Sequence, residues 1–210
     1  MEHTKTYYKR IVETNGKSII VEGPVDGNTL KKYTFDEGLV AFRIPQEQFV
    51  AIQEIADLDE GRIIICRDGD NIIGYTTYLY PDPLERWSDG NLPYLLELGA
   101  IEISEQYRAI GLGKAMLELS MLDNAMEDYI IITTEYYWHW DLKNSGLDVF
   151  EYKKIMQKMM AAGGMEVFST DDPEITSHPA NCLMARIGKR ITNDQIQAFD
   201  NIRFQNRFFL

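Results

Sequence analysis

One stretch decides the fold: Leu96-Glu-Leu-Gly-Ala-Ile-Glu-Ile-Ser-Glu-Gln-Tyr-Arg-Ala-Ile-Gly-Leu-Gly-Lys-Ala-Met116. Its first part is largely apolar and predicts a strand over residues 95–103. The part that follows predicts a helix from Gly113 to about Glu127. A strand therefore runs through a short turn directly into a helix.

The turn itself has the composition of an anion site. Gly111 and Gly113 let the backbone bend and approach a ligand without a Cβ in the way. The amide N–H groups of a first helical turn have no partner inside the helix, and together with the helix dipole they attract an anion. Arg108 and Lys114 add positive charge. A pyrophosphate is the ligand that suits this turn.

Two common phosphate motifs do not describe it. A P-loop would need Gly in place of Arg108 and Ser or Thr in place of Ala115. A dinucleotide fingerprint, Gly-x-Gly-x-x-Gly, would need Gly in place of Met116. The turn therefore belongs to another class of phosphate-binding loop.

The rest of the chain predicts alternating strands and helices without repeats. Asp68-Gly69-Asp70-Asn71 is typical of a hairpin turn, and it lacks the acidic spacing of a calcium loop. The expected order is β-α-β-β-β-α-β-α-β with a helical tail, in one domain over residues 1–210 with a core of 18–190 and a tail of 191–210. Strands are expected at 18–22, 62–67, 72–79, 129–134 and 165–169, and helices at 45–58, 148–162, 178–188 and 193–204.

Phe150, Ile155 and Met159 are expected to form the buried face of the helix over 148–162, and Gly163-Gly164 to end it.

Composition excludes several function classes. The 210 residues have a net charge of −12, which argues against a nucleic-acid partner because phosphate contacts need clustered Lys and Arg. The acidity favours either a basic partner or solubility alone. Apolar runs are too short for a membrane span, and the N-terminus has no apolar segment of a signal peptide. With only Cys66 and Cys182, a disulfide scaffold is not expected, and a cytoplasmic, reducing location is.

A resemblance explains the loop. Arg108-Ala-Ile-Gly111-Leu-Gly113 matches Arg/Gln-x-x-Gly-x-Gly/Ala, the acetyl-CoA loop of the GNAT acetyltransferase superfamily. The resemblance implies an α/β (α+β) fold with a mixed, mostly antiparallel central sheet flanked by helices. It implies that acetyl-CoA is the donor substrate, that no metal is needed, and that the phosphates meet Arg108, Ala109, Ile110, Gly111, Leu112, Gly113 and Lys114.

A second resemblance covers nearly the whole chain. Residues 78–87, 131–142 and 171–188 are similar to the acetoin-utilisation protein acetyltransferases of Bacillus-like bacteria. That family implies that the acceptor is a lysine of a protein. It further implies that this protein is acetyl-CoA synthetase, which acetylation inactivates. A homodimer is one possible assembly, and the apolar end of the tail is a candidate to dock either on the core or on a second subunit.

The resemblance also assigns the base. Histone-type GNATs carry a Glu eleven residues before the first residue of the phosphate motif, which is Glu97 here. Glu102 is the alternative, because a bulge in this strand would swap the faces of the two side chains. An amine must lose a proton before it attacks a thioester, so a carboxylate here would act as general base. Backbone groups of Ile101 and Ile103 are expected to pair with the pantetheine arm.

The proton donor for the leaving thiolate is left open. GNATs often use the Tyr of a Leu-Tyr-x-x-x-Gly pattern, but Met184 or Met160 stands in that place. A thiol pKa of about 8.5 makes unassisted departure feasible. Tyr136, Tyr137 and His139 are the other candidates, within an aromatic run, residues 136–140, that either lines an acceptor channel or caps the core.

Three functions therefore compete. The first is a protein lysine acetyltransferase. The second is an acetyltransferase for a small amine, which would share every feature of the donor site. The third is an acetyl-CoA sensor without turnover, which the missing Tyr favours.

Overall fold

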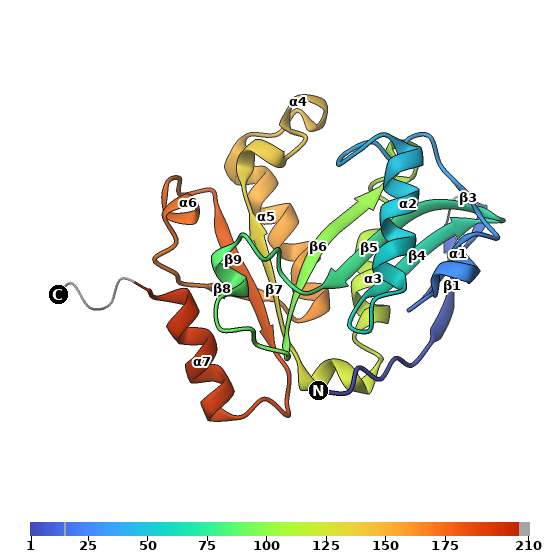
Figure 1. Cartoon of the computed structure of the whole chain (residues 1–210). Helices are drawn as coiled ribbons and strands as arrows, with labels where there is room; N and C mark the ends of the chain where they lie inside the picture. Colours follow the sequence, from blue (N-terminus) through green and yellow to red (C-terminus); the bar gives the residue numbers. More distant parts are fainter. Residues whose placement is uncertain (15, 206–210) are drawn as a thin grey trace. The chain divides into compact units, whose positions relative to one another are not determined.

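The computed structural model describes residues 1–14 and 16–205. Two compact units make up the chain: Met1–Tyr80 with Glu97–Met126 forms unit 1, and Pro81–Leu96 with Glu127–Leu210 forms unit 2. Across the described residues nine strands are present; six of their pairings are antiparallel, and one short pairing is parallel. The predicted mixed, mostly antiparallel sheet flanked by helices is thus confirmed (Figure 1).

Unit 1 is built on a sheet whose strand order is β1-β2-β4-β5-β6. The hairpin turn predicted at residues 68–71 joins β4 to β5, and Gly69 there has a φ of 59°. The two-residue strand β3 pairs with β5 in parallel. The strands are β1 (Tyr8–Thr14), β2 (Lys17–Gly23), β3 (Thr34–Phe35), β4 (Arg62–Asp68), β5 (Asn71–Leu79) and β6 (Leu95–Ile103).

Helices cover both faces of this sheet (Figure 1). On one face α2 (Pro45–Ala56) buries Ile52 against Ile63 and Ile65 of β4, together with the short α1 (Gly27–Leu30). Because side chains alternate along a strand, the residues between them point to the other face. There α3 (Leu112–Ser120) packs on β1, β2, β4 and β5.

Helix α3, which follows the glycine-containing turn after β6, is shorter than predicted. It was expected to reach about Glu127, but α3 ends at Ser120, whose hydroxyl donates to the carbonyl of Met116. Asp123 then accepts from the amide of Ala125 and starts the 3-10 turn η3 (Asn124–Asp128). A local side-chain bond thus replaces helix continuation.

A buried ion pair fastens the N-terminal residues of unit 1. Arg62 and Asp123 are 1% and 2% exposed, and Nη1 of the arginine donates to Oδ2 of the aspartate at 2.8 Å. The same guanidinium donates to the carbonyl of Thr4 at 2.6 Å, and the aspartate accepts from the amide of Thr6 at 3.0 Å. Because each charge has backbone partners as well, the cost of burying it is offset.

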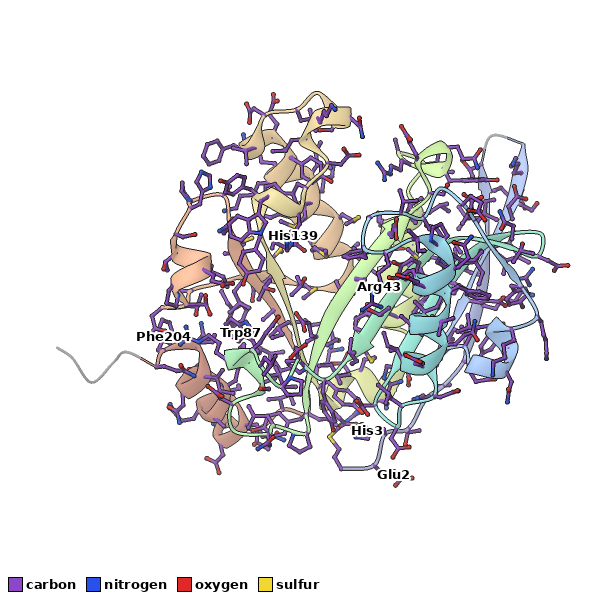
Figure 2. All side chains as sticks on the ribbon, turned by 45° about the horizontal axis from the view of Figure 1, so that its top comes forward. Glu2, His3, Arg43, Trp87, His139 and Phe204 are labelled. Atoms are coloured by element: carbon purple, nitrogen blue, oxygen red, sulfur yellow. The ribbon has the colours of Figure 1, made fainter. Side chains whose placement is uncertain are left out.

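Unit 2 holds three antiparallel strands in the order β7-β9-β8. One face carries Leu183 and Ala185 of β9, which pack with Phe199 of the C-terminal helix and with Trp87. Trp87 is labelled in Figure 2. The opposite face carries Cys182, whose thiol meets the side chain of Gln157. The elements are β7 (Ile130–Glu135), β8 (Glu166–Phe168), β9 (Cys182–Ile187), α4 (Leu142–Ser145), α5 (Val149–Met160), α6 (Pro173–Thr176) and α7 (Asn193–Arg203), with 3-10 turns η1 (Arg86–Ser88), η4 (Tyr137–His139) and η5 (Ala161–Gly163).

Two predictions for unit 2 are wrong. Residues 178–188 were expected to form a helix, but Cys182–Ile187 forms strand β9 between β7 and β8. Leu, Met, Ala and Arg favour helices locally, and tertiary pairing overrides that weak preference. On α5 the buried stripe is Met156 and Met160, whereas Phe150 and Ile155 are exposed. The sequence pattern placed the buried face one residue too early.

The other predicted strands and helices are present. Asp148 caps α5 in a capping box, and Gly164 ends the turn after it with a φ of 75°. The predicted helix at 193–204 is α7, whose cap Thr192 accepts from the amide of Gln195. Residues 206–210 of the predicted tail lie outside the described residues.

Candidate active site

Strand β6 carries both candidate bases, and a bulge decides where they point. Thr77 of β5 pairs with Ala100 and Tyr78 pairs with Leu98, so Gly99 is an extra residue between them. Five positions separate Glu97 from Glu102, which would put them on opposite faces of a regular strand. The extra residue restores the phase. Both carboxylates therefore share the face on which β5 presents Tyr75, Thr77 and Leu79.

Glu102 is held firmly at one end of that face. It is 4% exposed, Oε1 accepts from the amide of Ala41 at 2.7 Å, and Oε2 accepts from the hydroxyl of Tyr75 at 2.8 Å. Burial, followed by the negative charge of Glu102, raises the pKa of Tyr75 well above its ordinary value. The phenol thus stays protonated and remains a donor to the carboxylate.

Glu97 lies at the other end, opposite Leu79. It is partly exposed, and its neighbours Leu96 and Leu98 are buried. Gly99, the next residue along this edge, is exposed, and a Cβ there would come within 3.0 Å of the Leu79 side chain. The carboxylate of Glu97 is therefore partly accessible to solvent and has apolar neighbours.

The turn after β6 has the geometry that an anion needs. Ala109 and Gly111 both have positive φ, 62° and 84°, and Gly111 is the left-handed N-cap of α3. No side chain caps this helix, so the amides of its first turn, Leu112 to Lys114, have no capping oxygen from Gly111. A Cβ added at Gly111 would meet no atom within 4 Å. Glycine is required there for its backbone conformation.

Two cations flank this turn. Nε of Arg108 donates to the carbonyl of Ile103 at 3.1 Å, which ties the exposed guanidinium to the end of β6. Lys114, in the first turn of α3, is 64% exposed and lies 3.5 Å from Glu118. Ile101 and Ile103 are half-buried in β6, and Ile110 is half-buried in the turn. The structure thus brings the predicted loop residues together on one short segment.

Relatives of the chain share its full length. It is 58% identical to acetoin utilization protein AcuA of Bacillus subtilis over 208 residues, covering 99% of both chains, and 57% identical to AcuA of Bacillus licheniformis with the same coverage. The chain belongs to the AcuA family. The crystal structure of the acetoin utilization protein from Exiguobacterium sibiricum is 58% identical, with a TM-score of 0.95 over 98% of this chain and 97% of that one. No protein-family model matches the chain.

The candidate proton donors of this AcuA-family chain lie in unit 2. Met184 and Met160 are buried at 2% and 1% exposure, and neither can donate a proton. Burial raises the pKa of Tyr136 above its ordinary value, and Asp172 adds to the shift. His139 is exposed, with its ring 5.8 Å from that of Tyr136 (Figure 2).

The aromatic run at 136–140 forms stacked pairs. The rings of Tyr136 and Trp138 stack at 4.8 Å, and those of Trp140 and Tyr152 at 5.2 Å. Trp138 keeps half of its surface exposed. The run therefore partly covers unit 2 and partly offers an aromatic surface.

Sequence reasoning missed Glu135, the last residue of β7. Trp140 Nε1 donates to one carboxylate oxygen at 3.2 Å, and the Thr133 hydroxyl donates to the other at 3.2 Å. Burial nevertheless raises the pKa of Glu135. A lone acid at the end of an apolar strand is the only signal in the sequence, and it does not report burial.

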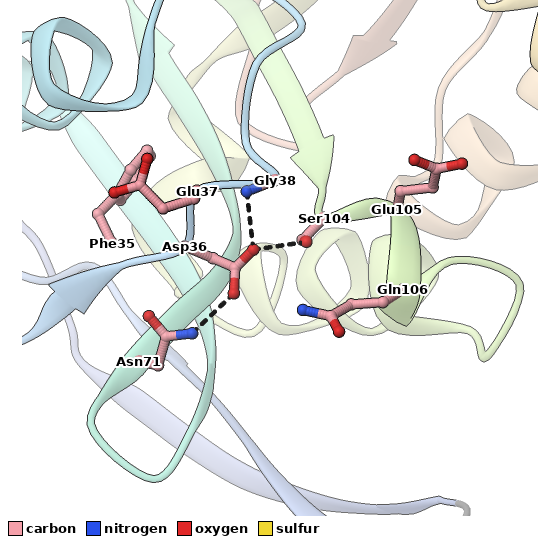
Figure 3. Close-up of a pocket in the computed structure, with 8 residues that line it drawn as sticks. All are labelled: Phe35, Asp36, Glu37, Gly38, Asn71, Ser104, Glu105 and Gln106. Carbon is pink, nitrogen blue, oxygen red and sulfur yellow. Dashed lines mark hydrogen bonds between the residues drawn. The ribbon is translucent and has the colours of Figure 1, made fainter.

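Sequence reasoning also missed Asp36. Its carboxylate accepts from Ser104 Oγ at 2.7 Å, from the Gly38 amide at 2.9 Å and from Asn71 Nδ2 at 2.8 Å (Figure 3). Burial alone would raise its pKa, but these donors outweigh burial and lower it. Asp36 fixes the start of the turn after β6 through Ser104. A cavity of about 670 Å³ opens beside it, lined by Phe35, Asp36, Glu37, Gly38, Asn71, Ser104, Glu105 and Gln106.

The described residues contain neither a metal cluster nor a membrane-spanning helix. Among residues 1–14 and 16–205 no group of three or more His, Cys, Asp or Glu side chains could hold a metal ion. The helices of that same part of the chain are all too short or too polar to cross a bilayer.

Proposed function

We propose that the chain is a cytoplasmic GNAT-type N-acetyltransferase that moves the acetyl group of acetyl-CoA to a lysine of a partner protein. By family resemblance that partner is acetyl-CoA synthetase, which acetylation inactivates. One observation carries the donor side: Gly111 begins α3 in the left-handed conformation, and Arg108 precedes it by three residues. Membership of the AcuA family supports the role in acetoin utilisation.

The loop would hold the donor by its phosphates. The amides of Leu112 to Lys114 point out of the start of α3 and can donate to a phosphate. Arg108, a few residues earlier in the sequence, adds a positive charge. The peptide groups of Ala109 and Ile110 complete the turn, and Gly113 keeps the first helical turn free of a side chain. Ile101 and Ile103 offer the backbone of β6 to an extended arm.

Glu97 would act on the acceptor. It takes a proton from the lysine ammonium, and the freed amine forms a C–N bond to the acetyl carbon while the C–S bond breaks. The attacking nitrogen loses its second proton as the amide forms, and coenzyme A, which leaves as a thiolate, takes up that proton. Glu102 is a weaker candidate, because Tyr75 and Ala41 already occupy its oxygens.

Two other functions share the donor loop. An acetyltransferase for small amines would use every residue named above. A sensor that binds acetyl-CoA without turnover is favoured by the methionines, Met160 and Met184, that replace the usual Tyr.

A single assay separates the three. Purified protein is offered acetyl-CoA with acetyl-CoA synthetase or with a panel of small amines, beside Arg108→Ala and Gly111→Asp. Label on a synthetase lysine, lost in both variants, supports the protein acetyltransferase. Turnover only with a small amine replaces the acceptor. Tight acetyl-CoA binding without turnover on any acceptor replaces the enzyme by the sensor.

A further inference from the structure

The first hairpin of unit 1 has no part in the proposed chemistry, yet it reaches the phosphate loop. Strands β1 and β2 pair over seven residues, and Arg10 lies opposite Val21, which in turn lies opposite Cys66 of β4. Paired residues share a face of the sheet. Arg10 therefore lies on the face of the sheet that α3 covers, on the edge strand β1, next to Val21.

Arg10 grips α3 through three hydrogen bonds. Nη2 donates to the carbonyl of Ala115 at 2.6 Å, and Nη1 and Nη2 both donate to Oε2 of Glu118 at 3.1 Å. The arginine side chain is 33% exposed, so these bonds are partly shielded from water. A strand at the edge of the sheet is thus tied to the first two turns of the helix.

The arrangement also concerns charge. Glu118 lies one turn after Lys114, and its other oxygen, Oε1, is 3.5 Å from the lysine Nζ. A free carboxylate there would lower the positive potential at the start of α3. Arg10 supplies the opposite charge, so Lys114 is not the only cation that Glu118 meets.

The hairpin meets the loop a second time, on the side before Arg108. Lys17 of β2 donates to the Tyr107 hydroxyl at 3.2 Å and to Asp68 at 2.5 Å, and that hydroxyl donates to Asp68 at 2.9 Å. A small cavity of about 120 Å³ lies along this contact, lined by Thr14, Lys17, Ile19, Gln106, Tyr107 and Ile110. The hairpin therefore contacts residues on both sides of the phosphate loop.

We propose that the β1–β2 hairpin braces the phosphate loop, and that Arg10 is its positioning residue. Arg10 fixes the first turns of α3 and neutralises Glu118, which keeps the anion site positive. This inference rests on the proposed function, because it concerns the same donor site. Arg10 acts on bound phosphate only through α3 and Glu118.

The test compares donors with and without phosphates. In Arg10→Gln the dissociation constant for coenzyme A, measured by calorimetry, is expected to rise roughly fivefold to tenfold. The kcat/KM for acetyl-pantetheine, which carries no pyrophosphate, is expected to stay within about twofold. Lys9→Gln is the matched control: it removes the same charge from an exposed neighbour on β1 and should leave coenzyme A affinity unchanged.

A second substitution isolates the charge. Glu118→Gln added to Arg10→Gln removes the uncompensated carboxylate and is expected to restore most of the lost affinity, whereas a purely structural fault would persist. Arg10→Lys should retain part of the affinity. Thermal melting of each variant reports whether it folds.

Three results would overturn the inference: an unchanged coenzyme A affinity in Arg10→Gln, an equal loss with acetyl-pantetheine, or no recovery in the double variant. A wild-type chain that binds no coenzyme A would instead reject the proposed function, and the inference with it. The wild-type measurement, made first, keeps the two failures apart.

Discussion

The two ends of β6 carry the same side chain in different surroundings. At one end Glu102 is buried and accepts hydrogen bonds from Tyr75 and from the backbone at Ala41. At the other end Glu97 is partly exposed and stands opposite Leu79. Because of the extra residue Gly99, both lie on one face.

The difference in burial predicts a structural role for Glu102 and a catalytic role for Glu97. Both oxygens of Glu102 already accept hydrogen bonds inside the chain, which leaves them less available to a substrate. A partly exposed carboxylate can be reached. Applying the same substitution at both ends of β6 tests this directly.

The largest effect is expected from Glu97→Gln. If Glu97 is the base, its amide cannot take the proton, and kcat should fall by about 10²- to 10⁴-fold. Coenzyme A affinity and the melting temperature should not change, because the side chain is partly exposed and the amide has the same size. Steady-state acetylation with calorimetry measures both, and an unchanged kcat would remove Glu97 from this role.

Glu102→Gln should behave in the opposite way. An amide cannot accept as strongly from Tyr75, and its NH₂ group cannot accept from Ala41 at all, so the free energy of unfolding should drop by about 2 kcal/mol. Urea titration measures the loss. Turnover per folded molecule should remain near that of the wild type; a collapse of kcat with unchanged stability would reverse the roles of the two residues.

Tyr75→Phe probes the same end more gently. Only one donor to Glu102 disappears and the ring remains, so the expected loss of stability is about 1 kcal/mol. The double variant with Glu102→Gln should lose less than the sum of the single losses, since the two groups form one bond. Strict additivity would show that the hydrogen bond contributes nothing.

The smallest effect is expected at Glu135 of unit 2, and it depends on pH. Burial raises its pKa in the folded chain above the ordinary value, so the folded state holds a proton that the unfolded state has already lost. Stability then falls as pH rises from the ordinary pKa through the raised one. Glu135→Gln should therefore match the wild type near pH 4 and melt at a higher temperature near pH 7.5. A variant that melts lower than the wild type at pH 7.5 would contradict this.

Much of the fold follows from local sequence. The hairpin at 68–71, strand β6 and helix α5 each carry their own turn, alternation or cap signals. Strand β1 was not predicted, because half of its residues face solvent at the edge of the sheet and its alternation is weak. The residues of strand β9 were predicted as a helix, because the local sequence does not show that they pair with β7 and β8.

The candidate site, like the fold, could be predicted in part from local sequence. The spacing from Arg108 to Gly113 marks the turn, and Gly111 adopts the positive φ that such a turn needs. The extra residue Gly99 could not be placed from sequence, because a bulge is defined by pairing with another strand. Asp36 and Glu135 were missed because hydrogen bonding and burial arise from residues far away in the chain.

The buried pair of Arg62 and Asp123 has a consequence for synthesis on the ribosome. The two residues are 61 positions apart, and Thr6 lies 117 positions before its aspartate partner. At a translation rate of about 5 to 20 residues per second, roughly 3 to 12 seconds pass between the synthesis of Arg62 and that of Asp123. Throughout that interval the nascent chain carries a cation that cannot yet be buried, so the start of the protein joins the folded body only after more than half of the chain has been translated.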